Sequence, residues 1–250
     1  MKKNQKLVDE ITRYVESNIK LFHDNRINKL KTLKLKNVLK KKNPYLFRAK
    51  YMLTADDIVK NLTNAYLSSA EETMFGDWLE GLAIFVSSKT LNGWKSAVTG
   101  VDLEFDKSNV RYIVSIKSGP NWGNSSQVKK MKEDFSKAKK TLRSSSSNLN
   151  IVAVNGCCYG IDNNPDKGEY FKYCGQDFWA LISGYEELYL DIIEPLASKA
   201  RERNDEFQQL FAQVHNKFVK EFITDFCIDG CIDWQKLVKF NSGNKITQNI

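Results

Sequence analysis

Histidine and cysteine are scarce in this 250-residue chain, and the kinds of site that depend on them are the first to be excluded. The sequence contains only two histidines, and its five cysteines form neither an even framework nor a CxxC pair. A zinc site of the usual Cys/His kind is therefore not expected, and unpaired thiols indicate a reducing, intracellular setting. Any catalytic chemistry must depend on carboxylates, lysines and hydroxyls.

Long apolar runs are also missing. No run approaches the roughly 18 residues that a membrane span requires, and the N-terminal lysines are not followed by the apolar stretch of a secretory signal. Hydrophobic residues make up 42% of the chain and charged residues 27%, as in an ordinary globular protein of one large domain or two small ones. We therefore expect no membrane partner.

Positive charge is concentrated in one segment. The net formal charge is +8, yet residues 25–55 contain ten bases and no acid. Such a segment is a candidate for binding a polyanion. A solvated helix face and a basic membrane-surface helix are the alternatives. Apolar residues at helical spacing within it favour a structured arm over a tail.

Several segments have the period of an amphipathic helix. Residues 5–22 form one such stretch, and Thr54 with Asp57 forms a capping box that opens a helix to about residue 68. A separate helix is expected from Ser69 to about Ser88. Residues 126–143 and 203–226 have the same period, and the chain is expected to be largely helical from Gln176 onward.

Strand-like segments lie between these helices. Residues 98–105 and 110–117 are short β-rich runs joined by a turn-forming tetrad, which predicts a hairpin. Residues 148–155 form an apolar run that suits a buried strand. Helices, hairpin, helix, strand and helices in this order predict an α/β (α+β) core inside a helical shell.

One pair of polar residues on the predicted hairpin is a candidate for chemistry. Alternation places Asp102 on the face opposite Leu103 and Phe105, and it places Ser115 and Lys117 together near the end of the second strand. Neighbouring strands can then bring Asp102 close to Lys117. The pair is either a half-exposed ion pair of little energetic value or part of a Mg²⁺ site in which the lysine orients an attacking water.

These residues carry a resemblance. Gly100-Val-Asp102 followed by Val114-Ser-Ile-Lys-Ser-Gly119 resembles the signature of the PD-(D/E)xK nucleases, and the run from Lys117 to Gln127 is similar to type II restriction endonucleases of the PmeII-like kind. Further similar segments are Lys41–Lys50, Phe75–Glu80, Tyr173–Trp179 and Asp233–Leu237. The resemblance implies a restriction-endonuclease-like central mixed sheet flanked by helices, with helical additions at both termini. It also implies Mg²⁺-dependent, sequence-specific hydrolysis of double-stranded DNA in a prokaryotic cytoplasm.

The resemblance also implies roles for individual residues. Asp102 and Lys117 match the catalytic positions, whereas Ser115 stands where an Asp or Glu is usual. In Ser-x-Lys variants the missing acid comes from the next helix, which here offers Glu133 and Asp134, and Glu80 resembles an accessory acid. Glu80 could instead belong only to the polar stripe of its helix. The implied metal ligands are Asp102, the Ile116 carbonyl, Glu133 and Glu80.

Contacts to DNA are expected from the loop after the hairpin and from the basic arm. Asn and Gln side chains can make bidentate contacts to adenine, and lysines meet phosphates; Trp122 either stacks or anchors the loop, and anchoring is favoured. The candidate DNA-binding residues are Asn121, Trp122, Asn124, Ser125, Ser126, Gln127, Lys129, Lys130, Lys40, Lys41 and Lys42. A homodimer is expected because a palindromic site has two-fold symmetry.

The chain order suggests three segments. Residues 1–53 would be a helical basic arm for DNA clamping or dimerisation, residues 54–180 the nuclease core, and residues 181–250 a helical region packed on the core and available as a dimer interface. Two alternative functions stay open. One is a structure-specific repair or recombination nuclease, and the other is a catalytically inactive DNA-binding protein.

Overall fold

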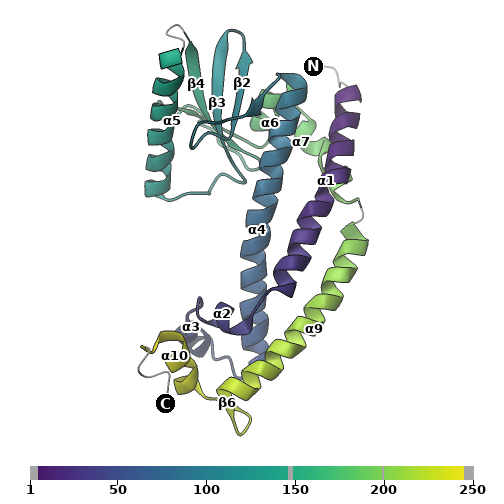
Figure 1. Cartoon of the computed structure of the whole chain (residues 1–250), viewed down its shortest axis with the longest axis vertical. Coiled ribbons are helices and arrows are strands. Elements are labelled where there is room, and N and C mark those ends of the chain that lie inside the picture. The colour runs from purple at the N-terminus through teal and green to yellow at the C-terminus, as the bar shows by residue number, and fades with distance from the viewer. Residues whose placement is uncertain (1–4, 146–148, 199, 245–250) are drawn as a thin grey trace. The chain divides into compact units, whose positions relative to one another are not determined.

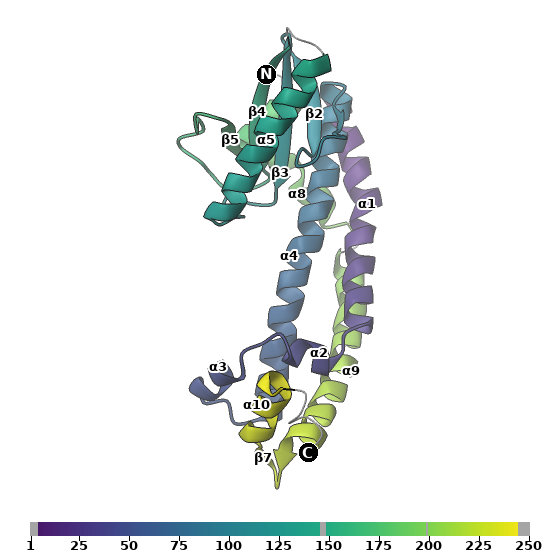
Figure 2. The same cartoon turned by 60° about the vertical axis from the view of Figure 1, so that its left-hand side comes forward.

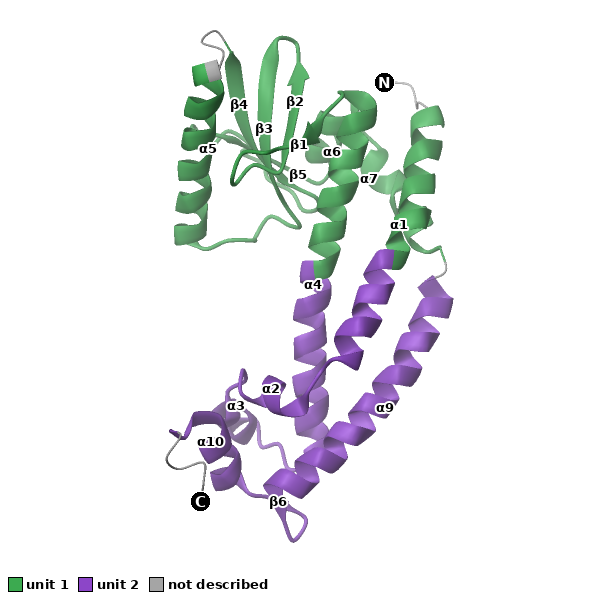
Figure 3. Cartoon of the chain, in the orientation of Figure 1, with its two compact units in different colours: residues 1–20, 74–198 green, residues 21–73, 199–250 purple. Residues whose placement is uncertain are grey.

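The computed structural model describes residues 5–145, 149–198 and 200–244, and the chain divides into two compact units (Figure 3). Unit 1 contains residues 1–20 and 74–198, and unit 2 contains residues 21–73 and 199–250. Each unit therefore combines parts of the chain that are far apart in sequence. The consecutive segments 1–53, 54–180 and 181–250 do not coincide with these units, because the two longest N-terminal helices each contribute to both. The roles expected of those segments remain predictions.

Those two helices are longer than expected. Helix α1 spans Gln5–Lys31, and α4 spans Ala55–Thr90 as one continuous 36-residue helix, where two helices were predicted. The predicted capping box is present at its start, since the Asp57 N–H donates to Thr54 Oγ1 over 3.1 Å. The expected break near Ser69 was wrong. No proline interrupts the helix, and the Ser69 carbonyl accepts from Thr73 Oγ1 four residues later, a bond that is compatible with helical backbone.

Unit 1 is built on a five-stranded mixed sheet in which the strands lie in chain order, β1-β2-β3-β4-β5. The strands are β1 (Trp94–Lys95), β2 (Leu103–Lys107), β3 (Val110–Lys117), β4 (Asn150–Cys157) and β5 (Phe171–Cys174). β1, β2 and β3 pair antiparallel, whereas β3, β4 and β5 pair parallel. This confirms the predicted α/β class with a central mixed sheet flanked by helices.

The predicted hairpin is β2–β3, with Leu103 opposite Val114. Its turn places Ser108 at φ 52° and Asn109 at φ 61°, the left-handed conformation that two-residue hairpin turns require. The first strand begins later than the expected residue 98. Gly100 has a positive φ of 81° and the Val101 N–H bonds to the Val98 carbonyl over 3.1 Å, so a turn precedes β2. Alternation along residues 101–105 predicts Val101 on the face of Leu103 and Phe105, but because of this turn Val101 packs with Ile113 instead.

Helices cover the sheet of unit 1 on both sides (Figures 1 and 2). On one face lies α5 (Ser125–Ser145), whose Met131, Phe135 and Ala138 pack against Ile113 of β3. The chain returns from α5 into β4, whose predicted first residue, Asn148, lies outside the described residues. After β5 follow α6 (Gln176–Ser183), α7 (Leu188–Asp191) and α8 (Ile193–Leu196), and the Phe178 ring fits against Gly156 of β4.

Unit 2 is almost entirely helical. Besides parts of α1 and α4 it contains α2 (Leu35–Leu39), α3 (Pro44–Ala49), α9 (Ala200–Phe226), the small hairpin β6 (Cys227–Ile228) and β7 (Cys231–Ile232), and α10 (Trp234–Ser242). Its core forms where Phe218, Phe222 and Phe226 of α9 meet Ile58 and Leu62 of α4. None of the helices in the described part of the chain has the length and apolarity to cross a membrane.

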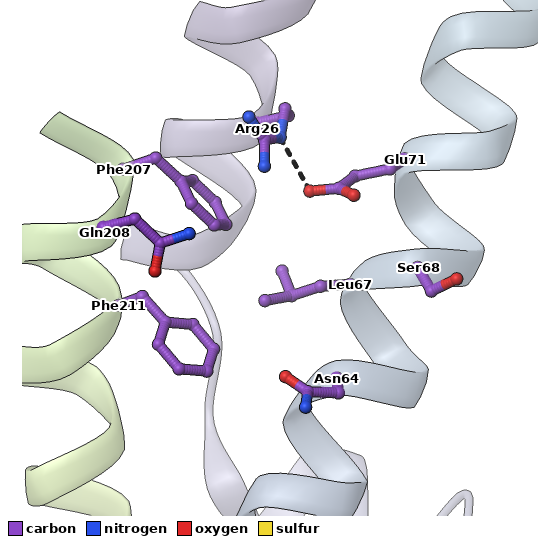
Figure 4. A pocket seen from close by; sticks show the side chains of 8 residues that line it. All are labelled: Arg26, Asn64, Leu67, Ser68, Glu71, Phe207, Gln208 and Phe211. Carbon is purple, nitrogen blue, oxygen red and sulfur yellow. Dashed lines mark hydrogen bonds and ion pairs between the residues drawn. The ribbon is translucent and has the colours of Figure 1, made fainter. Parts of the chain in front are cut away.

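A cavity of about 280 Å³ lies among α1, α4 and α9 within unit 2 (Figure 4). Arg26 forms one wall. Its guanidinium bonds to Glu71 over 2.7 Å and stacks 4.0 Å from the centroid of the Phe207 ring. The Arg26 side chain is only 14% exposed. Because the same side chain forms an ion pair and covers an aromatic ring, it joins the three helices at this level.

Replacing Arg26 should therefore destabilise the protein. We expect Arg26→Ala to lower the free energy of unfolding by about 2 kcal/mol, because it leaves Glu71 without its partner and uncovers Phe207. Arg201→Ala is the matched control, since Arg201 is exposed on α9 of the same unit, and it should stay within about 0.5 kcal/mol of wild type. Urea unfolding followed by circular dichroism measures both. Equal midpoints for the two variants would contradict the structural role of Arg26.

Candidate active site

The β2–β3 hairpin brings Asp102 and Lys117 together in unit 1. Asp102 immediately precedes β2, and its N–H donates over 2.8 Å to the carbonyl of Val114, the β3 residue that pairs with Leu103. The Asp102 carboxylate lies beside Ser115, whose Oγ is 3.4 Å from Asp102 Oδ2, and near Lys117. Lys117 Nζ is 3.9 Å from Asp102 Oδ2, and both side chains are partly exposed. The structure thus brings together the two residues on which the expected chemistry depends.

Asp102 is held by the neighbouring strand. The Ile116 N–H donates to Asp102 Oδ2 over 2.6 Å, and Ser115 Oγ donates to the same oxygen over 3.4 Å. Ser115 is buried. Two donors on one carboxylate oxygen fix the orientation of the Asp102 side chain. Ser115, which replaces the usual acid, therefore supports Asp102 instead of adding a second negative charge.

Glu80 of α4 faces the same place. Burial raises the pKa of the Glu80 carboxyl, and the negative charge of Asp102 raises it further, whereas Lys95 and Lys117 act in the opposite direction. Lys95 Nζ is 3.6 Å from Glu80 Oε1. A carboxyl whose pKa is raised by burial and by a second carboxylate is typical of a functional site.

A cysteine is buried near these acids. Burial raises the pKa of the Cys158 thiol to about 12, with a further contribution from the charge of Glu80. Cys158 is therefore protonated near neutral pH. It serves neither as a nucleophile nor as a thiolate ligand.

The acids of α5 lie on different sides of the helix. Glu133 lines a pocket of about 470 Å³ together with Lys129, Lys132 and Glu169. Asp134, by contrast, lies directly against Gly100, where an added Cβ would be 2.7 Å from Asp134 Oδ2, and it pairs with Lys130. Asp134 therefore lies at the loop that carries Asp102, whereas Glu133 lies in the pocket with Lys129 and Lys132.

The loop after β3 is organised around the start of α5. The Asn124 N–H donates to Gln127 Oε1 over 2.9 Å, and the Gln127 N–H donates to Asn124 Oδ1 over 3.0 Å. This reciprocal capping box is visible in the sequence as Asn followed three residues later by Gln, although we interpreted both residues only as DNA contacts. A bidentate contact of either amide to adenine would require its oxygen to leave the cap.

The remaining candidate DNA contacts differ in their surroundings. Trp122 is half-buried and packs against the core beneath α5, which agrees with an anchoring role. The exposed residues near it are Asn121, Ser125, Ser126, Lys129 and Lys130. Lys40 and Lys41 are exposed and Lys42 is half-buried, and all three belong to unit 2.

The donor set near Asp102 suits a hard cation. Among residues 5–145, 149–198 and 200–244, no three His, Cys, Asp or Glu side chains gather closely enough to hold a metal. Mg²⁺ needs fewer protein ligands, because it is usually bound by one or two carboxylates and retains several waters. Asp102 and Glu80, whose charges interact, would be the two carboxylates of such a site. A cation there would counter both causes that raise the pKa of Glu80, which are its burial and, second, the charge of Asp102.

Comparison with known families identifies the chain. Residues 9–204 match the family described as type II restriction endonuclease EcoO109I, and the chain belongs to this family. The protein is therefore a nuclease of the restriction endonuclease class, and membership in that class implies DNA binding. The match does not support the PmeII-like kind that the sequence suggested. A search of curated proteins finds no match.

The raised pKa of Glu80 has a consequence for stability. A carboxyl whose pKa is higher in the folded state destabilises the fold at every pH above that raised value. Glu80→Gln should therefore increase the free energy of unfolding at pH 7, by less than about 1 kcal/mol because the site is partly exposed and the Lys95 pair is lost.

Thermal unfolding of wild type and Glu80→Gln across a pH series tests this. The gain should fall as the pH is lowered through the raised pKa of Glu80, since the wild-type side chain is then neutral too. Glu72→Gln is the control, because Glu72 is an exposed acid of the same helix. A gain that is independent of pH would contradict the assigned cause.

Proposed function

We propose that this protein is a Mg²⁺-dependent endonuclease that hydrolyses phosphodiesters at a specific short sequence of double-stranded DNA. Family membership supports the class of enzyme. The observation that carries the proposal is the position of Lys117 Nζ 3.9 Å from Asp102 Oδ2, with Glu80 facing the same carboxylate. In this partly exposed site, the Asp102 and Glu80 carboxylates would bind a metal and the Lys117 ammonium would contact a phosphate.

Each residue of the site has a role that follows from its chemistry. Asp102, Glu80 and the Ile116 carbonyl would hold Mg²⁺, which supplies Lewis-acid stabilisation of phosphate charge and a more acidic bound water. Lys117 orients the attacking water and counters the charge that develops on the phosphate. The Ile116 N–H and Ser115 keep Asp102 in place. A further carboxylate from α5 would complete the set.

Recognition of DNA is proposed for two surfaces. The exposed Asn121 of the loop after β3, together with the exposed Ser125, Ser126, Lys129 and Lys130 of the first turns of α5, would contact bases and phosphates. Lys40, Lys41 and Lys42 would contribute salt-dependent phosphate contacts. A homodimer would match the two-fold symmetry of a palindromic site.

Substitution of the central pair tests the catalytic proposal. We expect Asp102→Ala and Lys117→Ala each to lower the rate of plasmid cleavage by at least about a thousandfold while DNA affinity changes little, because their contacts matter mainly in the transition state. The measurement is digestion of a defined plasmid with Mg²⁺, with EDTA as control, beside a gel-shift titration. Cleavage by either variant at the wild-type rate would refute the assignment.

The same digestion separates the alternatives. Discrete bands from wild type support a site-specific enzyme, whereas a smear or nicking only at unusual structures would indicate a repair or recombination nuclease. The serine at position 115 favours the third alternative, a protein that binds DNA without cutting it. That alternative predicts salt-dependent binding and no Mg²⁺-dependent nicking.

The source of the additional carboxylate is tested by two neighbouring variants. Because Asp134 lies against Gly100 and Glu133 lies in the other pocket, we expect Asp134→Asn to lower the cleavage rate roughly 10–100-fold, the usual effect of disturbing a metal site. Glu133→Gln should have a smaller effect. Titration of the cleavage rate with Mg²⁺ should show the larger shift for Asp134→Asn, and the reverse order would assign the role to Glu133.

A further inference from the structure

Asn155 is a polar side chain in the core of unit 1. It lies on β4 directly beside Ser115 of β3 and is only 1% exposed. A buried amide is costly unless its oxygen and its nitrogen are both bonded. Asn155 satisfies both: its Nδ2 donates to the Ser115 carbonyl over 3.2 Å, and its Oδ1 accepts from Trp122 Nε1 over 3.0 Å.

The Ser115–Ile116 peptide links Asn155 to the candidate metal ligand. The carbonyl of this peptide accepts from Asn155, and the N–H of the same peptide donates to Asp102 Oδ2 over 2.6 Å. A bond to the carbonyl polarises the peptide and strengthens donation by its N–H. Asn155 therefore acts on Asp102 through one peptide unit.

Trp122 also contacts the other half of the site. Lys117 Nζ lies 5.3 Å from the centroid of a Trp122 ring, within the range of a cation–π interaction. The face of the Trp122 indole thus contacts the Lys117 ammonium, and the indole N–H donates to Asn155. Trp122 comes from the loop between β3 and α5, next to the exposed Asn121.

We propose that Trp122 and Asn155 are positioning residues that fix the Lys117 and Asp102 side chains relative to each other. Through them the loop after β3 is connected to the catalytic pair. This rests on the proposed function, since it concerns how the same site is arranged. It predicts that loss of the Trp122 ring lowers the rate of the chemical step and leaves the affinity for DNA unchanged. It further predicts that Trp122 and Asn155 act as one unit.

Four variants test the proposal. Trp122→Phe keeps a ring over Lys117 and loses only the Nε1 donor, whereas Trp122→Leu loses both contacts, and Asn155→Leu loses the link to the Ser115–Ile116 peptide. Trp94→Leu is the control, because Trp94 is an exposed tryptophan of the same sheet whose ring contacts Arg111, at 4.7 Å from the guanidinium carbon to the ring centroid, instead of Lys117.

The first readouts are the single-turnover cleavage rate at saturating DNA, with Mg²⁺, and DNA affinity with Ca²⁺ in its place. We expect Trp122→Leu to lower the rate at least about tenfold with the affinity within about threefold of wild type, Trp122→Phe to lose less, and Trp94→Leu to match wild type. The Trp122→Leu, Asn155→Leu double variant should be no slower than the slower single variant.

A second readout does not depend on cleavage. In the metal-free protein, the ring over Lys117 should shift the Lys117 ε-methylene protons upfield in NMR spectra, and Trp122→Leu should abolish this shift. Asn155→Leu should move the Ile116 amide proton upfield as its bond to Asp102 weakens. If wild type does not cleave DNA, the proposed function fails, yet these spectra still decide whether the two residues position the pair.

Three results would overturn the proposal. A loss of DNA affinity in Trp122→Leu with an unchanged saturating rate would make Trp122 a DNA contact. A lower melting temperature with unchanged Lys117 resonances and an unchanged rate of the folded protein would make it a loop anchor only. Additive losses in the double variant would show that Trp122 and Asn155 act separately. Should Asn155→Leu fail to fold, the half-exposed Trp122 variants still distinguish the first two results.

Discussion

The candidate site depends on one hydrogen bond, from the Ile116 N–H to Asp102 Oδ2. In a continuous antiparallel ladder an N–H of β3 would bond to a carbonyl of β2. Because a turn with Gly100 at a positive φ precedes β2, the pairing with β3 ends at Leu103, and the Asp102 carboxylate accepts from the Ile116 N–H in place of a backbone carbonyl. The turn that ends the strand pairing therefore also positions the candidate metal ligand Asp102. Lys117 follows on the same face two residues after Ser115, so the register of β3 positions the lysine as well.

Ser115 changes the electrostatics of this arrangement. A second acid at that position would place another negative charge beside Asp102. The hydroxyl instead donates to Asp102, which leaves Glu80 as the carboxyl that responds to the charge of Asp102. The pKa of Glu80 is raised first by burial and then by this charge. The two carboxylates of the proposed site are within the number that Mg²⁺ usually takes from a protein.

The sequence predicted the parts of the fold that local patterns determine. Residues 110–117 form β3 as expected, since alternation and a Ser108-Asn109 turn are local signals. The short strands β1 and β5 were missed because their positions are determined by pairing with neighbours and not by their own pattern. The division of α4 into two helices was wrong because serines weaken a helix without ending it. Asn155 could not be recognised either, since its role depends on two partners, Trp122 and Ser115, that are 33 and 40 residues away.

The basic segment of residues 25–55 shows why a charge count overstates a binding surface. Arg26 is paired with Glu71, and Lys36 lies 3.0 Å from Asp225 of α9. Arg48 stacks over Trp234, at 5.3 Å from the ring centroid. These cations stabilise unit 2, and each ion pair would have to break before its cation could neutralise a phosphate. A cation that neutralises a DNA phosphate releases the counterion bound to that phosphate, and this release provides the affinity. The contribution of this segment to DNA binding therefore depends on its exposed, unpaired lysines and is smaller than its ten positive charges suggest.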